Sequence, residues 1–151
     1  MVKFYEGVYS RVSPYVLAVA WWHATPTQPK GSVGRSKSRM QTMLDIGREI
    51  ELPNLPHDVA FIVEMLFEAG PVSVSGDGSI PLTWHDLTVW QTALGVSLPL
   101  WQLRLMRRLS LEYLSQNRSA VDPDTPQPWK TTATPSRRAK VADNVRGILR
   151  G

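Results

Sequence analysis

Histidine and aspartate are adjacent at two places in the chain, His57-Asp58 and His85-Asp86, and a third histidine is His23. Imidazole and carboxylate groups are common zinc ligands, so these residues are the first candidates for a metal site. However, no two histidines have the i, i+4 spacing of a helical zinc site. Each pair also falls in the first turn of an expected helix, where the helix dipole stabilises an aspartate. We therefore expect no metal and no other cofactor.

Motifs of common enzyme active sites are missing from the sequence. It contains no phosphate-binding loop, no Gly-x-Ser-x-Gly motif and no cysteine, which also excludes disulfides and thiolate metal sites. The 151 residues instead include six tryptophans, at positions 21, 22, 84, 90, 101 and 129. Core packing accounts for two or three of them, and tryptophan is enriched at protein interfaces. We therefore expect a binding protein without catalytic residues, not an enzyme.

Charge alternates along the chain. Residues 1–48 hold seven Lys/Arg and two acids, residues 49–103 hold seven acids and no Lys or Arg, and residues 104–151 hold ten Lys/Arg and four acids. This pattern suits charge pairing between segments of one chain, or between copies in a homo-oligomer, as well as it suits nucleic acid.

Two helices joined by a tight turn are expected in the middle of the chain. Thr83 can cap the first helix, with Asp86 in its first turn, and Gly95 suits the left-handed position at its end. Ser97 can cap the second helix, with Pro99 in its first turn. The result is an αα-hairpin over residues 83–118. Its second helix has an apolar stripe of Trp101, Leu105, Leu109 and Tyr113 and a basic outer face of Arg104, Arg107 and Arg108.

Three further helices are predicted before this hairpin. Ser13-Pro14 reads as a cap and first-turn proline before an apolar run that ends ahead of Pro26. This run is too short to cross a bilayer, which needs about 20 residues, so we expect a buried helix and no membrane. The other two helices are expected over residues 37–49 and 57–70, the latter ended by Gly70-Pro71.

Two connecting segments and the C-terminal region are expected to differ from these helices. Residues 25–38 have the composition of a linker, and residues 72–80 favour a loop across the helices over a short hairpin, which is marginal alone. Four prolines between residues 122 and 135 interrupt regular structure, and Trp129 either folds back onto the core or is presented to a partner. Residues 137–150 combine Val141, Val145, Ile148 and Leu149 with basic residues. This tail either docks on its own protein or becomes helical on an acidic partner.

These patterns predict a mainly α, small single-domain helical bundle built on the αα-hairpin, with a Pro-rich linker and a basic C-terminal segment. We expect an N-terminal apolar helix and basic linker over residues 1–36, a helical core domain over residues 37–121, and a Pro-rich, basic tail over residues 122–151.

The order of motifs over residues 52–129 carries a resemblance. A Leu-Pro-rich helix ends near Phe67-Glu68, and a Gly-rich loop follows. The later motifs are Ile80-Pro81-Leu82-Thr83-Trp84-x-Asp86-Leu87, Trp90, Leu94-Gly95-Val96-x-Leu98-x-x-Trp101 and the segment Arg108–Leu114. This order resembles that of the tail assembly chaperones of long-tailed, siphovirus-like bacteriophages. These proteins commonly have Pro-Trp-Glu at the start of the second helix, whereas here Leu100 separates Pro99 from Trp101 and Gln102 replaces the acid.

The resemblance implies a non-enzymatic protein of the host cell cytoplasm. Such a chaperone binds the tape measure protein, and also tail tube subunits, during tail assembly, and is not kept in the finished tail. The candidate partner-binding residues are Trp84, Trp90, Arg104, Arg107, Arg108, Trp129, Arg137, Arg138 and Lys140.

Two other functions stay open. A helix-turn-helix DNA-binding protein would use residues 98–115 as its recognition helix. Against this reading, the arginines lie about two turns into that helix and an acidic segment precedes it, so we do not expect nucleic acid as the partner. A structural virion protein, at the head–tail junction or in the tail, is the second alternative.

Overall fold

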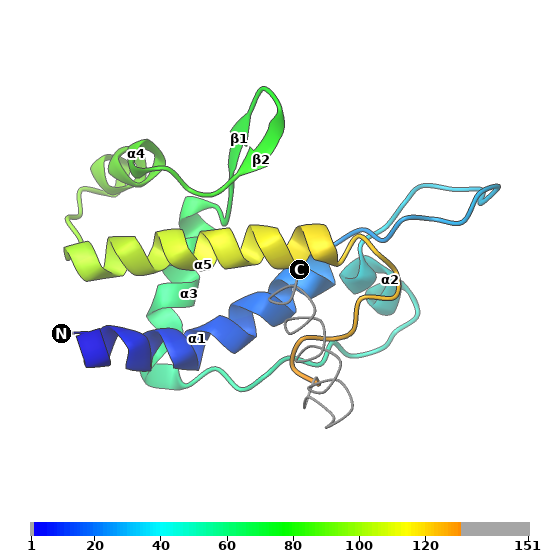
Figure 1. Cartoon of the computed structure of the whole chain (residues 1–151), viewed down its shortest axis with the longest axis horizontal. Helices are drawn as coiled ribbons and strands as arrows, with labels where there is room; N and C mark the ends of the chain where they lie inside the picture. Colours follow the sequence, from blue (N-terminus) through cyan, green and yellow to red (C-terminus); the bar gives the residue numbers. More distant parts are fainter. Residues whose placement is uncertain (1, 131–151) are drawn as a thin grey trace, which may run out of the picture.

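The computed structural model describes residues 2–130, which form one small, mainly α domain with five α-helices, as predicted (Figure 1). The elements are α1 (Val2–His23), α2 (Arg39–Asp45), a 3-10 turn (His57–Val59), α3 (Ala60–Ala69), β1 (Ser73–Ser75), β2 (Gly78–Ile80), α4 (Trp84–Leu94) and α5 (Leu100–Ser119). Among these residues, none of the helices has the length and apolar character needed to cross a membrane. The expectations for residues 137–150 lie outside the described part of the chain.

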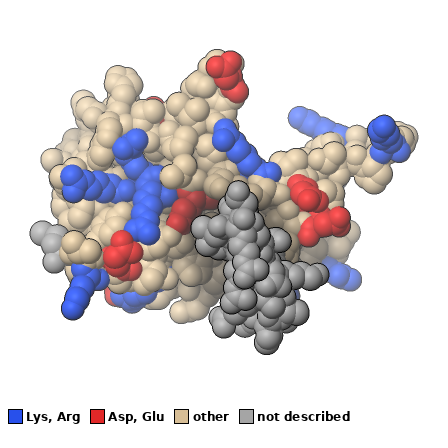
Figure 2. Space-filling model, viewed as in Figure 1, with Lys and Arg blue, Asp and Glu red and all other residues tan. Residues whose placement is uncertain are grey.

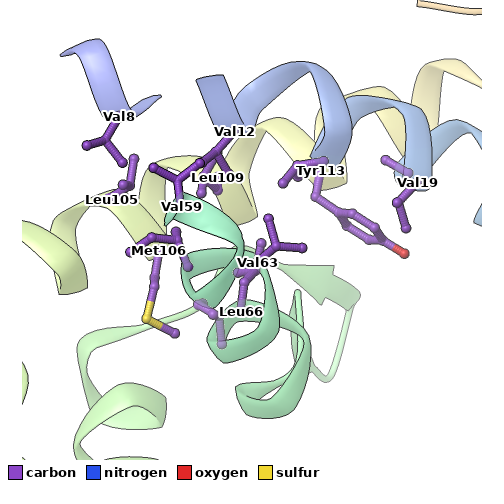
Figure 3. Packing of buried hydrophobic residues seen from close by; sticks show 14 of the residues in the cluster. Val8, Val12, Val19, Val59, Val63, Leu66, Leu105, Met106, Leu109 and Tyr113 are labelled. Atoms are coloured by element: carbon purple, nitrogen blue, oxygen red, sulfur yellow. The ribbon is translucent and has the colours of Figure 1, made fainter. Parts of the chain in front are cut away.

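Helices α1 and α5 lie side by side and make the most extensive helix–helix contact of the described residues, while α3 crosses them (Figure 1). Val12 and Val16 on α1 and Leu105 and Leu109 on α5 follow helical spacing, and all four are completely buried. Figure 3 shows this main cluster, in which side chains of α1 and α5 meet those of α3. The core is therefore shared by residues on both sides of the boundary expected at residue 36.

The prediction that the two helices over residues 83–118 pack mainly on each other is wrong. Both helices form, but α5 packs mainly on α1, while α4 contacts α3 and buries its Leu87 in the main cluster. Along α5, Leu105, Leu109 and Tyr113 are buried as predicted, whereas Trp101 is only partly buried. The reason is that α5 has 20 residues and a wide apolar face, which the longer α1 covers better than the 11-residue α4.

The start of α1 also differs from the prediction. The helix begins at Val2 and continues through Pro14, so Ser13 is not its cap. A proline inside a helix costs about 3 kcal/mol, and the buried Val8 and Val12 on the preceding turns offset this cost by packing in the main cluster. The helix bends midway along its length (Figure 1), as a proline commonly causes.

Local stop and start signals explain the shorter elements. Ser38 caps α2, which ends earlier than expected because Gly47 adopts a left-handed φ of +70°. The helix predicted over residues 57–70 is confirmed as the 3-10 turn followed by α3, with Gly70 at its end. The capping box of Thr83 and Asp86 at α4 and the left-handed Gly95 are also confirmed. Ser97 was the wrong cap.

The residue that precedes α5 is Pro99, and no side chain caps this helix. Residues 24–38 form no helix or strand, as expected for a linker.

The loop expected over residues 72–80 is instead a short antiparallel hairpin, in which Ser73 pairs with Ile80 and Ser75 with Gly78. It does not stand alone, because α5 is hydrogen-bonded to the segment before β1 and to β2. The Ser110 hydroxyl donates to the Pro71 carbonyl oxygen at 2.7 Å, and Arg118 donates to the Ser79 carbonyl oxygen at 2.5 Å. These bonds supply the support that an isolated hairpin lacks.

A second, smaller cluster lies at the C-terminal ends of α1 and α5. Its buried members are Trp21, Trp22, Ala24 and Ala120. Trp129 folds back against it, with its ring centre 5.5 Å from that of Trp21. Of the two alternatives for Trp129, the structure has the folded-back one.

Candidate partner-binding site

Four of the predicted site residues lie together. Trp84 at the start of α4 and Arg104, Arg107 and Arg108 on α5 surround one open hollow, which Pro81 and Leu111 complete. We call these six residues the Arg–Trp surface. Figure 2 shows basic side chains gathered over the part of the molecule where Figure 1 places the first half of α5.

The position of Trp84 is fixed by hydrogen bonds between the preceding segment and α5. The Leu82 N–H donates to the hydroxyl of Ser110 at 2.8 Å, and the Leu82 carbonyl oxygen accepts from Nε of Arg107 at 3.1 Å. Leu82 and Ser110 are both buried, so these bonds are shielded from water. The Arg107 guanidinium then lies 4.6 Å from the centre of the Trp84 ring, a cation–π contact.

The capping box strengthens this arrangement. The carboxylate of Asp86 accepts hydrogen bonds from the hydroxyl and the N–H of Thr83, and these bonds lower the pKa of Asp86 below its usual value. A charged carboxylate at this position stabilises the start of α4, where Trp84 is the first residue.

Arg108 is held by the N-terminal half of α1. It forms an ion pair with Glu6 at 2.8 Å and lies 3.4 Å from the centre of the Tyr9 ring. Burial works to lower the pKa of Arg108, but the hydrogen bonds with Glu6 and Tyr5 outweigh it and raise the pKa above its usual value. Tyr9 in turn donates to the carboxylate of Glu112, which also accepts from Ser13 at 2.8 Å. Arg108 is thus part of a network that joins α1 to α5.

Arg104 differs from its two neighbours. It is exposed and has no ion-pair or hydrogen-bond partner among residues 2–130. It also lines a second hollow, with Val2, Tyr5 and Trp101, so it stands between two partly apolar depressions. Its guanidinium is therefore free to bind a carboxylate of another molecule in the bidentate manner typical of arginine.

Two apolar side chains next to these arginines are exposed. Trp84 is 43% exposed and Leu111 is 57% exposed. Tryptophan and arginine are the residues most enriched among those that dominate binding energy at protein interfaces. The arrangement can bury apolar groups of a partner against Trp84 and Leu111 while Arg104 pairs with an acidic side chain.

Trp90 and Trp129 do not belong to the Arg–Trp surface. Trp90 is partly buried against the main cluster, and its Nε1 is buried without a hydrogen-bond partner among the described residues. Trp129 packs in the second cluster. Arg137, Arg138 and Lys140 lie outside the described residues.

Sequence reasoning missed the contribution of α1 to this site. Tyr5, Glu6 and Tyr9 support Arg108 from a part of the chain expected to be a separate N-terminal region. The i, i+4 spacing of the two tyrosines was the available signal, because it places both rings on one side of a helix. Nothing in the sequence indicated that this side would meet α5.

Asp58 and His23 make contacts unrelated to a metal site. Asp58 pairs with Arg11 at 2.5 Å, and this hydrogen bond lowers the pKa of Asp58. Nδ1 of His23 lies 2.7 Å from the hydroxyl of Tyr113. Across residues 2–130, no three His, Asp or Glu side chains come together as a metal site requires.

Comparisons of the chain with protein-family models, curated proteins and solved structures found no significant match.

Proposed function

We propose that this chain is a non-enzymatic phage tail assembly chaperone, which binds the tape measure protein and tail subunits in the host cytoplasm during tail assembly. The observation that carries the proposal is the Arg–Trp surface, with Arg104 exposed and unpaired among the described residues beside two exposed apolar side chains. Surfaces of this composition bind other proteins.

The resemblance and the site share several residues. The motif over residues 80–87 supplies Pro81 and Trp84, and the segment over residues 108–114 supplies Arg108 and Leu111. Four of the six residues of the Arg–Trp surface therefore belong to motifs that carry the resemblance to tail assembly chaperones.

Several contacts favour a protein partner over DNA. Glu6 neutralises Arg108, and Arg107 is stacked on Trp84, which leaves Arg104 as the cation without a partner among the described residues of this surface. DNA binding gains most of its affinity from many phosphate contacts at once. A recognition helix also presents its N-terminal residues to the groove, and here the first turn of α5 carries the apolar Leu100 and Trp101. A partner with a few acidic and several apolar side chains fits better.

Under this proposal, a reading frame for a long, helical tape measure protein lies next to this gene, and co-expression of the two proteins tests the proposal. We expect the two proteins to co-purify and the tape measure protein to become more soluble. Arg104→Glu should weaken the complex at least about tenfold. Arg35→Glu is the matched control, because Arg35 is also exposed but lies in the linker, away from the Arg–Trp surface. The Arg35→Glu variant should bind the tape measure protein as tightly as the unmodified chain does.

Three outcomes would contradict the proposal. Absence of co-purification, combined with tight heparin binding that Arg104→Glu abolishes, would favour the DNA-binding alternative. Recovery of the chain in purified, finished particles would favour a structural virion protein. Equal loss of binding in the Arg35→Glu and Arg104→Glu variants would mean that net charge, not the Arg–Trp surface, determines the interaction.

A further inference from the structure

A groove lies on another side of the molecule, between α1, α3 and the segment that precedes the 3-10 turn. Its volume is about 430 Å³, and its apolar lining includes Tyr15, Val19, Leu52, Leu55, Val63 and Phe67. Leu52 is 37% exposed, so part of this lining is open to solvent. An apolar depression of this kind suits the apolar side of an amphipathic helix.

One acidic side chain lines this groove, and a second lies on the same helix. Glu64 on α3 lines it, and Glu68 follows one turn later on the same helix. Both are exposed, and neither forms an ion pair within residues 2–130. The occupant that completes the site should therefore combine apolar residues with basic ones.

Other acids of the 49–103 segment already pair with the basic segments of this chain. Asp58 binds Arg11 from the first basic segment, and Glu51 binds Lys130 from the second at 2.8 Å. The alternating charge of the sequence is thus used, at least in these two places, to pair segments within one chain. Glu64 and Glu68 are the next acids along the same segment.

The described part of the chain ends beside the groove. Trp129 packs against Trp22, with 5.8 Å between ring centres, and Lys130 pairs with Glu51. His23 and Leu52 line the groove, and they directly follow Trp22 and Glu51 in the sequence. Residues 131–151 begin at this point, so their path to the groove is short.

We propose that residues 137–150 occupy this groove of their own chain as an amphipathic helix. This segment lies outside the described residues, and its sequence supplies both features that the groove requires. Val141, Val145, Ile148 and Leu149 provide the apolar side, and five Lys/Arg residues accompany a single acid. The apolar side covers Leu52, Leu55 and Phe67, and basic residues pair with Glu64 and Glu68.

Paramagnetic relaxation in the full chain tests this docking directly. The chain has no cysteine, so a nitroxide can be attached at one introduced cysteine without background. Asn54→Cys places the label between Leu52 and Leu55, at an exposed position. We expect loss of the methyl signals of Val141, Val145, Ile148 and Leu149. Val74→Cys, in the hairpin and 81% exposed, is the matched control and should leave these signals intact.

Two results of this experiment would overturn the proposal. The first is that the methyl signals of residues 137–150 have the same intensity with the label at residue 54 as with the label at residue 74. The second is signal loss that occurs only when label and observed methyls are on different molecules in a mixed sample, since a second copy would then occupy the groove.

A charge reversal separates docking from chance proximity. Glu64→Lys should restore the tail methyl signals in the Asn54-labelled chain, whereas Asp77→Lys, an equal charge change in the β1–β2 turn, should not. Unchanged signals of Leu105 and Leu109 would show that the core of both variants is folded. Identical behaviour of the two variants would contradict the assigned charge pairing. No partner protein is present, so the result is independent of the proposed function.

Discussion

Two arginine–tryptophan stacks lie in different parts of the molecule, and their distances from guanidinium to ring centre are nearly the same. The Arg39 guanidinium lies 4.4 Å from the Trp21 ring centre, and that of Arg107 lies 4.6 Å from the Trp84 ring centre. Their surroundings differ. Trp21 is 8% exposed and donates to the Thr125 carbonyl oxygen, whereas Trp84 is 43% exposed.

The difference assigns the two stacks different roles. Arg39 also donates to the carbonyl oxygens of Ala120 and Asp122, so its stack joins α2 to the segment after α5. Arg107 is fixed by one backbone bond, to Leu82, and holds Trp84 in an exposed position. The same contact therefore stabilises the fold where it is enclosed, and prepares a binding surface where it is open.

Truncation of the two tryptophans should give the largest contrast. Trp21→Ala removes a buried aromatic side chain and a hydrogen bond, so we expect a loss of about 3–5 kcal/mol in unfolding free energy. Trp84→Ala should cost about 1 kcal/mol or less, because its ring is already partly solvated. Urea denaturation measures both. Equal losses would contradict the distinction between an enclosed and an open stack.

Replacement of the arginines should have the next largest effect. Arg39→Lys keeps the charge but loses the planar group that reaches two carbonyl oxygens, so we expect a cost of about 1.5–3 kcal/mol. Arg107→Lys loses one such bond and should cost about half as much. Thermal or urea unfolding checks both values. A smaller effect at Arg39 than at Arg107 would mean that the second cluster does not depend on this bridge.

Removal of the Ser110 hydroxyl tests how Trp84 is positioned. Ser110→Ala leaves the Leu82 N–H and the Pro71 carbonyl without their partner inside the protein, at a cost of about 1–3 kcal/mol. The Trp84 ring should also become more mobile, which nitrogen-15 relaxation of its indole N–H would detect in a chain that keeps all its other tryptophans. Ser97→Ala is the control, since Ser97 caps no helix. Unchanged relaxation of the Trp84 indole would contradict the positioning role of Ser110.

The smallest effect is expected at the capping box, and it should depend on pH. The pKa of Asp86 is lower in the folded protein, so its stabilising contribution is present above the ordinary aspartate pKa, about 3.9, and is lost as the pH falls through the folded value. Asp86→Asn should cost about 1 kcal/mol at neutral pH. Denaturation curves at pH 7 and at acidic pH should show the difference between variant and unmodified chain shrinking. A difference independent of pH would contradict the ionic role.

The sequence determined the features that depend on neighbouring residues. The cap of Thr83 and Asp86, the left-handed Gly95 and the end of α3 at Gly70 were all predictable, because each involves groups within about one helical turn. The mainly helical class follows from the spacing of apolar residues in the same way.

Only the tertiary structure decided which helices pair and which arginine of the Arg–Trp surface has no partner among the described residues. Arg108 meets Glu6 across 102 residues of sequence, and Ser13 meets Glu112 across 99. Spacing along the chain carries no information on such contacts, because apolar stripes on several helices compete for the same partner. In the folded chain, α1 covers α5 and binds Arg108, and α5 is hydrogen-bonded to the segment before the β1–β2 hairpin. Helix α4 therefore does not cover α5, and Arg104 is exposed between two hollows.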